Sequence, residues 1–171
     1  LNTAIKLVEA ATEIGADCVK FQTFKASSVI TRKAPKAAYQ LETTDPGESQ
    51  YDMLKKLELD YDDFATIKQA CEKNGIRFLS TPYNEEDADL LERLGVDAYK
   101  IASGQLVEPS FLEHVAKKGK QMIISTGMGT LSEAFDAVKT IRNAGNHDIV
   151  VLQCTTNYPS PIEDANLRTM T

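Results

Sequence analysis

The sequence predicts an α/β fold with parallel strands, and more specifically an incomplete (β/α)8 TIM barrel. Segments with helical periodicity alternate strictly with short apolar segments along all 171 residues. The apolar segments are typical of parallel strands that crossover helices cover. Each of them also ends in polar residues, and a barrel assembles its active site from the carboxyl ends of all its strands.

The helices are predicted from apolar residues three or four positions apart and from capping residues at their ends. Gly15 is placed to end the first helix, and Asn84 is placed to cap a later one. Ser110 with Glu113, and Thr130 with Glu133, have the spacing of capping boxes. The predicted helices span residues 1–14, 60–73, 85–94, 110–119 and 130–145, and a further helix is expected to begin near Glu163.

The strands are predicted at residues 16–24, 76–81, 98–102, 121–127 and 148–155. Five strands cannot close an eight-stranded barrel, so we expect them to be about strands 2 to 6 of one. We expect residues 1–171 to form a partial catalytic domain, with the first and last strands outside this chain. A doubly wound dinucleotide-binding sheet is the less favoured α/β alternative. The sequence has no GxGxxG, and Gly127-Met128-Gly129 alone is weak support for it.

Residues 25–59 form a connection much longer than a usual loop between a strand and a helix. Within it, Gln50–Leu57 is predicted to be a short helix with Tyr51, Leu54 and Leu57 facing inward. Two interpretations remain open: a solvated excursion, or a lid that contacts substrate.

Composition excludes several classes of function. The formal net charge is −6 and there is no run of Lys or Arg, so we expect no nucleic-acid partner and no anionic membrane surface. No apolar segment is long enough to span a membrane. The three cysteines are odd in number and widely spaced, which favours a reduced, cytoplasmic setting. No complete metal site can be assembled from these residues.

The polar residues at the strand ends indicate an anion site. Lys100 lies among apolar neighbours, where its charge is costly unless an anion meets it. Two lysines with several hydroxyl groups around one mouth favour a small polyanion that carries both phosphate and carboxylate. Singly, Lys20 is also consistent with a surface lysine, and each hydroxyl with a helix cap. The strand-end residues are Lys20 and Gln22, Ser80 and Thr81, Lys100 and Ser103, Ser125 and Thr126, and Thr155 and Thr156.

Six segments in the same order resemble the sialic acid synthase family, which includes N-acetylneuraminate synthase and bacterial legionaminate-type synthases. They are Val19–Thr23, Gln50–Lys55, Leu79–Tyr83, Tyr99–Gly104, Ile124–Met128 and Cys154–Pro159. Together they are highly specific, although each alone is not. Residues 34–40 and 48–51 are most similar to the bacterial, legionaminate-leaning branch.

The resemblance implies an enzyme that condenses phosphoenolpyruvate with an N-acyl hexosamine to give a nine-carbon 2-keto sugar acid and phosphate. It assigns Lys20 and Lys100 to the phosphoenolpyruvate anion and Gln22 and Tyr158 to the acceptor sugar. Where the family often has Asn, this sequence has Thr156, so either Thr156 or the following asparagine is expected to contact substrate. The residues expected to donate hydrogen bonds to phosphoenolpyruvate oxygens are Thr81, Ser103 and Ser125.

The resemblance also implies parts that these residues do not supply. They are the ligands of a divalent metal (Mn or Mg), an acidic residue on the first strand, and a C-terminal antifreeze-like domain that reaches into a partner subunit of a homodimer. We therefore expect residues 1–171 alone to be inactive. Two alternatives stay open: a sister synthase that makes a 3-deoxy sugar-phosphate acid, and a non-catalytic, barrel-derived binding module.

Overall fold

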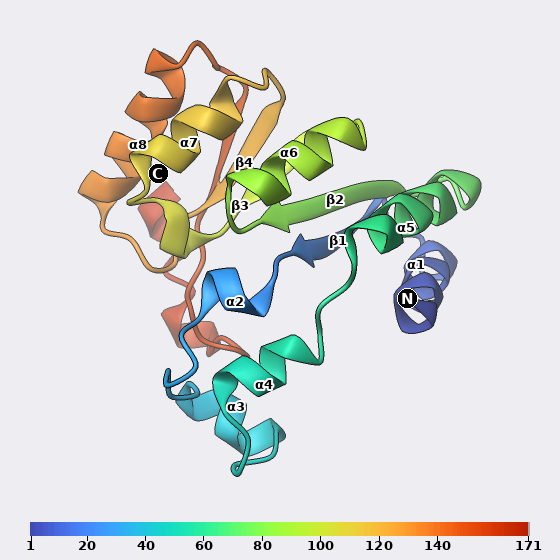
Figure 1. The fold of residues 1–171 in the computed structure, drawn as a ribbon. Coiled ribbons are helices and arrows are strands. Elements are labelled where there is room, and N and C mark those ends of the chain that lie inside the picture. The colour runs from blue at the N-terminus through green and yellow to red at the C-terminus, as the bar shows by residue number, and fades with distance from the viewer. Residues whose placement is uncertain (171) are drawn as a thin grey trace.

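The computed structural model describes residues 1–170 and shows an α/β protein with parallel strands, which confirms the predicted class (Figure 1). The strands are β1 (Cys18–Thr23), β2 (Arg77–Pro82), β3 (Ala98–Ile101), β4 (Gln121–Ser125) and β5 (Ile149–Leu152). The helices are α1 (Asn2–Glu13), α2 (Ala26–Val29), α3 (Ala38–Thr43), α4 (Gln50–Lys55), α5 (Tyr61–Lys73), α6 (Glu85–Arg93), α7 (Pro109–Ala116) and α8 (Leu131–Asn143). Short 3-10 turns are η1 (Ser103–Gln105), η2 (Ile162–Asp164) and η3 (Leu167–Met170).

Strand register determines which side chains share a face of the sheets. β1 pairs with β2, and β3, β4 and β5 form a second parallel sheet; β2 also lies close to β3. Gln22 is opposite Thr81, and Lys100 is opposite Ile123. Successive side chains point to opposite faces, so Ser125 lies on the same face as Lys100. The register therefore gathers polar side chains on one face, near the carboxyl ends.

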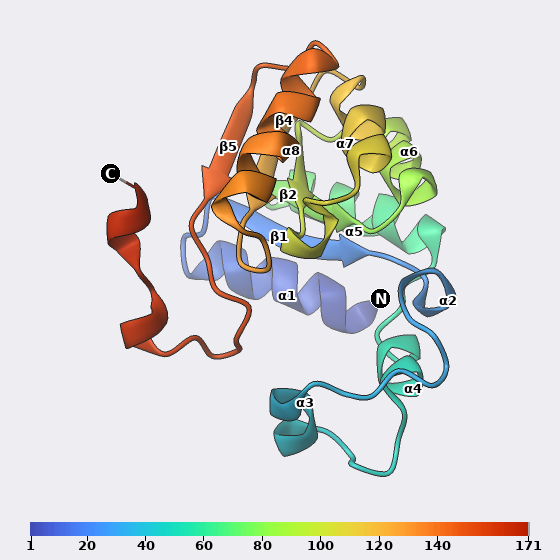
Figure 2. The same cartoon turned by 90° about the vertical axis from the view of Figure 1, so that its left-hand side faces the viewer.

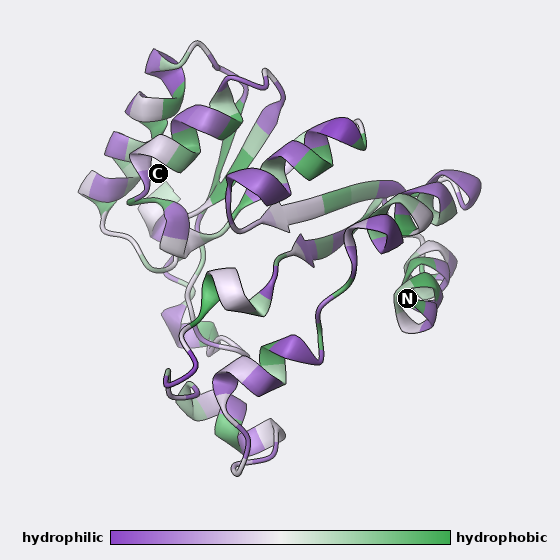
Figure 3. Ribbon diagram, in the orientation of Figure 1, coloured by the Kyte–Doolittle hydropathy of each residue, from purple (hydrophilic) through white to green (hydrophobic). Residues whose placement is uncertain are grey.

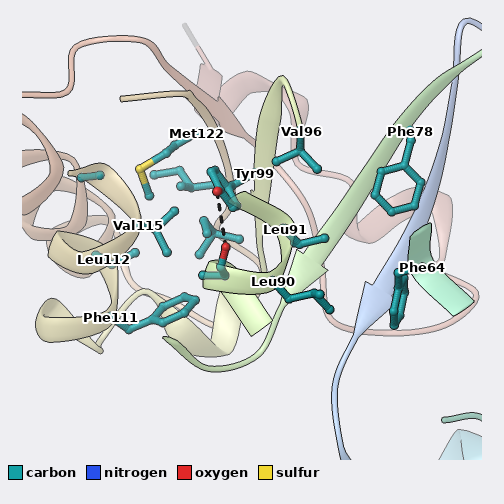
Figure 4. Packing of buried hydrophobic residues seen from close by; sticks show 14 of the residues in the cluster. Phe64, Phe78, Leu90, Leu91, Val96, Tyr99, Phe111, Leu112, Val115 and Met122 are labelled. Carbon is teal, nitrogen blue, oxygen red and sulfur yellow. Dashed lines mark hydrogen bonds between the residues drawn. The ribbon is translucent and has the colours of Figure 1, made fainter. Parts of the chain in front are cut away.

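The hydrophobic core lies between the other face of the strands and the helices, as the two orthogonal views show (Figures 1 and 2). Tyr99 is fully buried there beside Leu91 and Met122, and its hydroxyl donates to the carbonyl of Ala88 at 3.4 Å (Figure 4). Hydrophilic and hydrophobic residues alternate along the helices, as an amphipathic covering layer requires (Figure 3). This packing fixes the strands that carry the polar face.

Several helix ends follow the predicted local chemistry. Gly15 and Gly75 have φ of 76° and 69°, the left-handed conformation that ends a helix. The side chain of Asn84 accepts from the amide of Asp87 at 2.8 Å. Thr130 and Glu133 form the predicted capping box at the start of α8.

The predicted capping box of Ser110 was wrong. α7 begins at Pro109 and has Glu108 at its N-cap. Proline has a fixed φ and no amide hydrogen, and both suit the first position of a helix. Ser110 therefore lies inside the helix.

The connection between β1 and α5 is folded and held by its own hydrogen bonds. The Lys36 ammonium is buried; it donates to the Thr44 hydroxyl at 2.9 Å and forms an ion pair with Glu48 at 3.2 Å. The predicted short helix is present as α4, but its inward residue is Met53, whereas Leu57 is 64% exposed. The helix ends at Lys55, so Leu57 lies outside its periodicity.

The segment after β5 has no α-helix near Glu163, where one was predicted. Two 3-10 turns, η2 and η3, occupy this segment instead. Asn166 lies between them with a φ of 44°, which interrupts a right-handed helix. Within residues 1–170, no helix is both long enough and apolar enough to cross a membrane.

Replacing a buried leucine tests whether α6 anchors the core. Leu91 of α6 is 0% exposed, so we expect Leu91→Ala to lower the free energy of unfolding by about 2–5 kcal/mol. Leu57→Ala is the matched control, and at this exposed site we expect a loss below about 0.5 kcal/mol. Urea denaturation followed by circular dichroism measures both. Equal losses in the two variants would contradict the assignment of Leu91 to the core.

Candidate anion and acceptor site

The lysine of β3 is the central charged group of the polar face. Lys100 is 8% exposed, and its ammonium donates to the carbonyl of Ile101 at 2.8 Å and to the hydroxyl of Ser125. Burial, together with the positive charge of nearby Lys20, lowers the pKa of Lys100 to about 8. The structure thus brings Lys20 and Lys100 together.

The other buried lysines show how unusual Lys100 is. Lys36 and Lys118 have side chains only 2% and 7% exposed, and each forms an ion pair with at least one carboxylate. Burial alone would lower the pKa of Lys118, but its hydrogen bonds to Asp89 and Glu92 raise it above its usual value. Among residues 1–170, neither Lys100 nor Lys20 forms an ion pair. Their charge is available to an anion.

The strand ends beside the lysines carry neutral hydrogen-bonding groups. Thr81 is 2% exposed on β2, opposite Gln22 of β1. The amide of Gln22 donates through Nε2 to the hydroxyl of Tyr83 at 2.7 Å. Gln22 is two residues after Lys20 on the same face of β1, so the two side chains are separated by about 7 Å along the strand.

Three further predicted site residues lie in the turns after the strands. Ser103 begins η1 directly after β3 and is half-buried. Thr156 lies beside the turn after β4, where a Cβ added to Gly127 would come within 2.7 Å of its hydroxyl oxygen. Tyr158 is 64% exposed, and its ring centroid is 5.8 Å from that of Tyr39 in α3. Tyr158 therefore contacts the connection between β1 and α5.

Two tyrosines near the site were missed from the sequence. Tyr83 follows Thr81 by two residues, so strand alternation could have placed it on the polar side. Tyr39 gave no such signal, because its contact with Tyr158 joins segments far apart in the chain.

The described side chains do not fit a divalent cation. No group of three His, Cys, Asp or Glu residues within 1–170 is arranged to hold a metal. The two ammonium groups of Lys20 and Lys100 would also repel a cation. The arrangement suits an anion instead, with hydroxyl groups as neutral donors.

These features define a class of protein: an α/β protein that gathers two lysines and several hydroxyl groups near the carboxyl ends of parallel strands. Residues 7–171 match the profile of the NeuB family. The chain belongs to this family of sialic acid synthases, as its six sequence segments predicted.

Individual relatives give the same result. The chain is 45% identical to the N,N'-diacetyllegionaminic acid synthase of Campylobacter jejuni, over 99% of this chain and 52% of that protein. It is 41% identical to the synthase of the same name from Legionella pneumophila, over 99% of this chain and 49% of that protein. The crystal structure of N-acetylneuraminic acid synthetase from Leptospira borgpetersenii superposes with a TM-score of 0.82 at 26% identity, covering 98% of this chain and 54% of that one. The chain thus spans about half the length of these relatives.

The lowered pKa of Lys100 predicts that anion binding depends on pH. The charged form loses its proton as pH rises through about 8. Sulfate remains a dianion in this range, so its affinity should fall about tenfold between about pH 7 and about pH 9.5. Calorimetric titration of the complete protein with sulfate measures this change.

Two variants control the sulfate experiment. Lys100→Met should bind sulfate weakly and without this pH dependence. Lys117 is an exposed lysine at the C-terminal end of α7 and forms an ion pair with Glu113. Lys117→Met should bind sulfate like the unsubstituted protein. A sulfate affinity that stays constant across the pH range would show that Lys100 does not hold the anion.

Proposed function

We propose that the complete protein is a nonulosonate synthase that condenses phosphoenolpyruvate with an N-acyl hexosamine such as N-acetylmannosamine. The products are a nine-carbon 2-keto sugar acid and phosphate. The observation that carries this proposal is the buried Lys100 beside Lys20, with no carboxylate partner among residues 1–170. The names of the related synthases support the same reaction class.

In this proposal, strands β1 to β5 are about strands 2 to 6 of a (β/α)8 barrel. The parallel pairing, the helices on one face and the polar carboxyl ends support it. Residues 1–171 are then part of the catalytic domain, and the remaining strands and a C-terminal antifreeze-like domain belong to the complete protein. We propose that this protein is a cytoplasmic homodimer and that residues 1–171 alone are inactive.

The two lysines hold the phosphoenolpyruvate anion in the proposed mechanism. Lys20 and Lys100 bind its phosphate and carboxylate, and Ser125 is positioned by its contact with Lys100. Because its pKa is about 8, Lys100 is mainly charged at neutral pH. Preorganised ammonium groups stabilise the developing negative charge and need no rearrangement during the reaction. The hydroxyl groups that would donate to the remaining oxygens are those of Thr81, Ser103 and Ser125.

The acceptor binds on the side of Gln22, Thr156 and Tyr158. C3 of phosphoenolpyruvate bonds to the aldehyde carbon of the open-chain sugar, whose oxygen takes a proton. Water then adds to the cation at C2 and loses a proton. Finally the C2 hydroxyl gives up its proton and becomes the carbonyl as the bond between C2 and the phosphate oxygen breaks, and the departing phosphate takes up a proton, which gives the 2-keto acid and inorganic phosphate.

A divalent metal, Mn or Mg, is part of the proposal for the complete protein only. The described residues do not supply its ligands, so these ligands would have to come from elsewhere in the protein.

Removing the Lys100 ammonium tests the catalytic assignment. In the full-length protein, Lys100→Ala should lower kcat/KM at least about 100-fold, because it removes a preorganised cation from the anion site. Phosphate release from phosphoenolpyruvate and N-acetylmannosamine measures the activity, and circular dichroism checks the fold. Lys117→Ala is the control and should retain full activity. A folded Lys100→Ala enzyme with normal turnover would refute the assignment.

The same assay separates the alternatives. Phosphate release with arabinose 5-phosphate, and not with N-acyl hexosamines, would identify the sister synthase of 3-deoxy sugar-phosphate acids. Absence of turnover in the full-length protein with every acceptor would favour a non-catalytic binding module.

A further inference from the structure

Two tyrosines from distant segments make contacts with the two predicted acceptor residues, Gln22 and Tyr158. Tyr83, from the turn after β2, accepts a hydrogen bond from the Gln22 amide at 2.7 Å. Tyr39, from α3 of the connection, packs against Tyr158, from the turn after β5, with ring centroids 5.8 Å apart. Burial raises the pKa of the Tyr83 phenol, and the neighbouring Tyr158 and Tyr39 hydroxyls add to this rise. These two contacts, Gln22 with Tyr83 and Tyr39 with Tyr158, define what we call the tyrosine cluster: Gln22, Tyr39, Tyr83 and Tyr158.

Tyr83 is held rigidly within this cluster. Its ring packs edge-on against Phe24, with centroids 5.9 Å apart. Its backbone amide donates to Asp87 at 3.3 Å, and Asp87 is fully buried and also accepts from the hydroxyl of Tyr61 at 3.0 Å. A fixed Tyr83 hydroxyl in turn fixes the rotamer of Gln22, which is otherwise exposed.

The contact between Gln22 and Tyr83 leaves two complementary groups for a ligand. Nε2 of Gln22 is engaged with Tyr83, so Oε1 remains an acceptor. The Tyr83 oxygen accepts this bond, so its own hydrogen remains a donor. A donor and an acceptor side by side match vicinal sugar hydroxyls or an acylamino group, and the neighbouring rings match the apolar face of a sugar.

Tyr39 brings the long connection into contact with Tyr158. It lies on α3, whose segment is stabilised by the buried Lys36 and its ion pair with Glu48. Figures 1 and 2 show that α3 lies apart from the main body of the fold. The contact of Tyr39 with Tyr158 is thus a link between this outlying segment and the turn after β5.

We propose that Tyr83 and Tyr39 are positioning residues for the acceptor sugar: Tyr83 orients Gln22, and Tyr39 orients Tyr158. Through Tyr39 alone, the connection then takes part in selecting the acceptor, while the lysines bind phosphoenolpyruvate. This inference rests on the proposed function. In this inference the acceptor side of the site begins at Gln22, which is two residues further along β1 than Lys20 of the anion side.

Steady-state kinetics of the full-length protein test the inference. Phosphate release is measured with N-acetylmannosamine and with a diacetamido hexose, varying each acceptor and then phosphoenolpyruvate. Tyr83→Phe keeps the ring and removes the hydroxyl, and we expect it to raise the KM of the better acceptor about tenfold. The KM of phosphoenolpyruvate should change by less than about twofold. Tyr39→Leu should show the same split, and Tyr39→Phe should restore the normal acceptor KM.

The matched control is Tyr51→Phe, a tyrosine of the same connection whose ring lies under Arg32, 4.8 Å from its guanidinium carbon. It should leave both KM values unchanged. An active enzyme in which Tyr83→Phe leaves the acceptor KM unchanged, or raises both KM values equally, overturns the inference alone. An unsubstituted full-length protein without turnover overturns the proposed function, and this inference with it.

Discussion

The buried ammonium of Lys100 is the constraint on which the rest of the structure depends. A charge taken out of water costs free energy unless an opposite charge meets it, and here two neutral oxygens meet it instead. Lys20 increases the cost by repulsion, which is reflected in the lowered pKa of Lys100. The hydrophobic core must offset this cost. The nearest contribution comes from the two residues that flank Lys100 in the sequence, because Tyr99 and Ile101 are both fully buried. A bound dianion would attract both ammonium groups, so the net electrostatic free energy of Lys20 and Lys100 would become favourable.

The two faces of the same strands divide stability from chemistry. Tyr99 and Ile101 point into the helices, whereas Lys100 between them points to the polar face. A register shift of one residue would exchange these roles, burying the ammonium in the core and exposing Tyr99. The burial of Tyr99 and its hydrogen bond to Ala88 of α6 therefore do more than stabilise the fold, because they also set the direction in which Lys100 points.

Local chemistry made much of this fold predictable, and long-range contacts made the rest unpredictable. The caps of Asn84 and Thr130 involve residues only three positions apart, and the buried face of α5 follows the helical period. Such local features can be predicted directly from the sequence. Ser110 failed because Pro109 competes for the first position of the helix. That Lys20 and Lys100 lie near one another could be predicted because each lies in the carboxyl-terminal part of a predicted parallel strand. The contact of Tyr39 with Tyr158 depends on how an outlying segment folds back, which no local pattern encodes.

The proposed anion side and the proposed acceptor side of the site are supported by different parts of the fold. Lys20, Lys100 and Ser125 lie on strands, where hydrogen-bonded register and core packing leave little freedom to change. Tyr39 and Tyr158 lie on segments outside the sheets, which tolerate change because few core contacts depend on them. In the proposed synthase, the chemistry common to all acceptors would thus sit on the rigid part of the fold. Substitutions in the connection and in the turn after β5 could then change which acceptor sugar binds. The position and orientation of the buried Lys100 would stay the same.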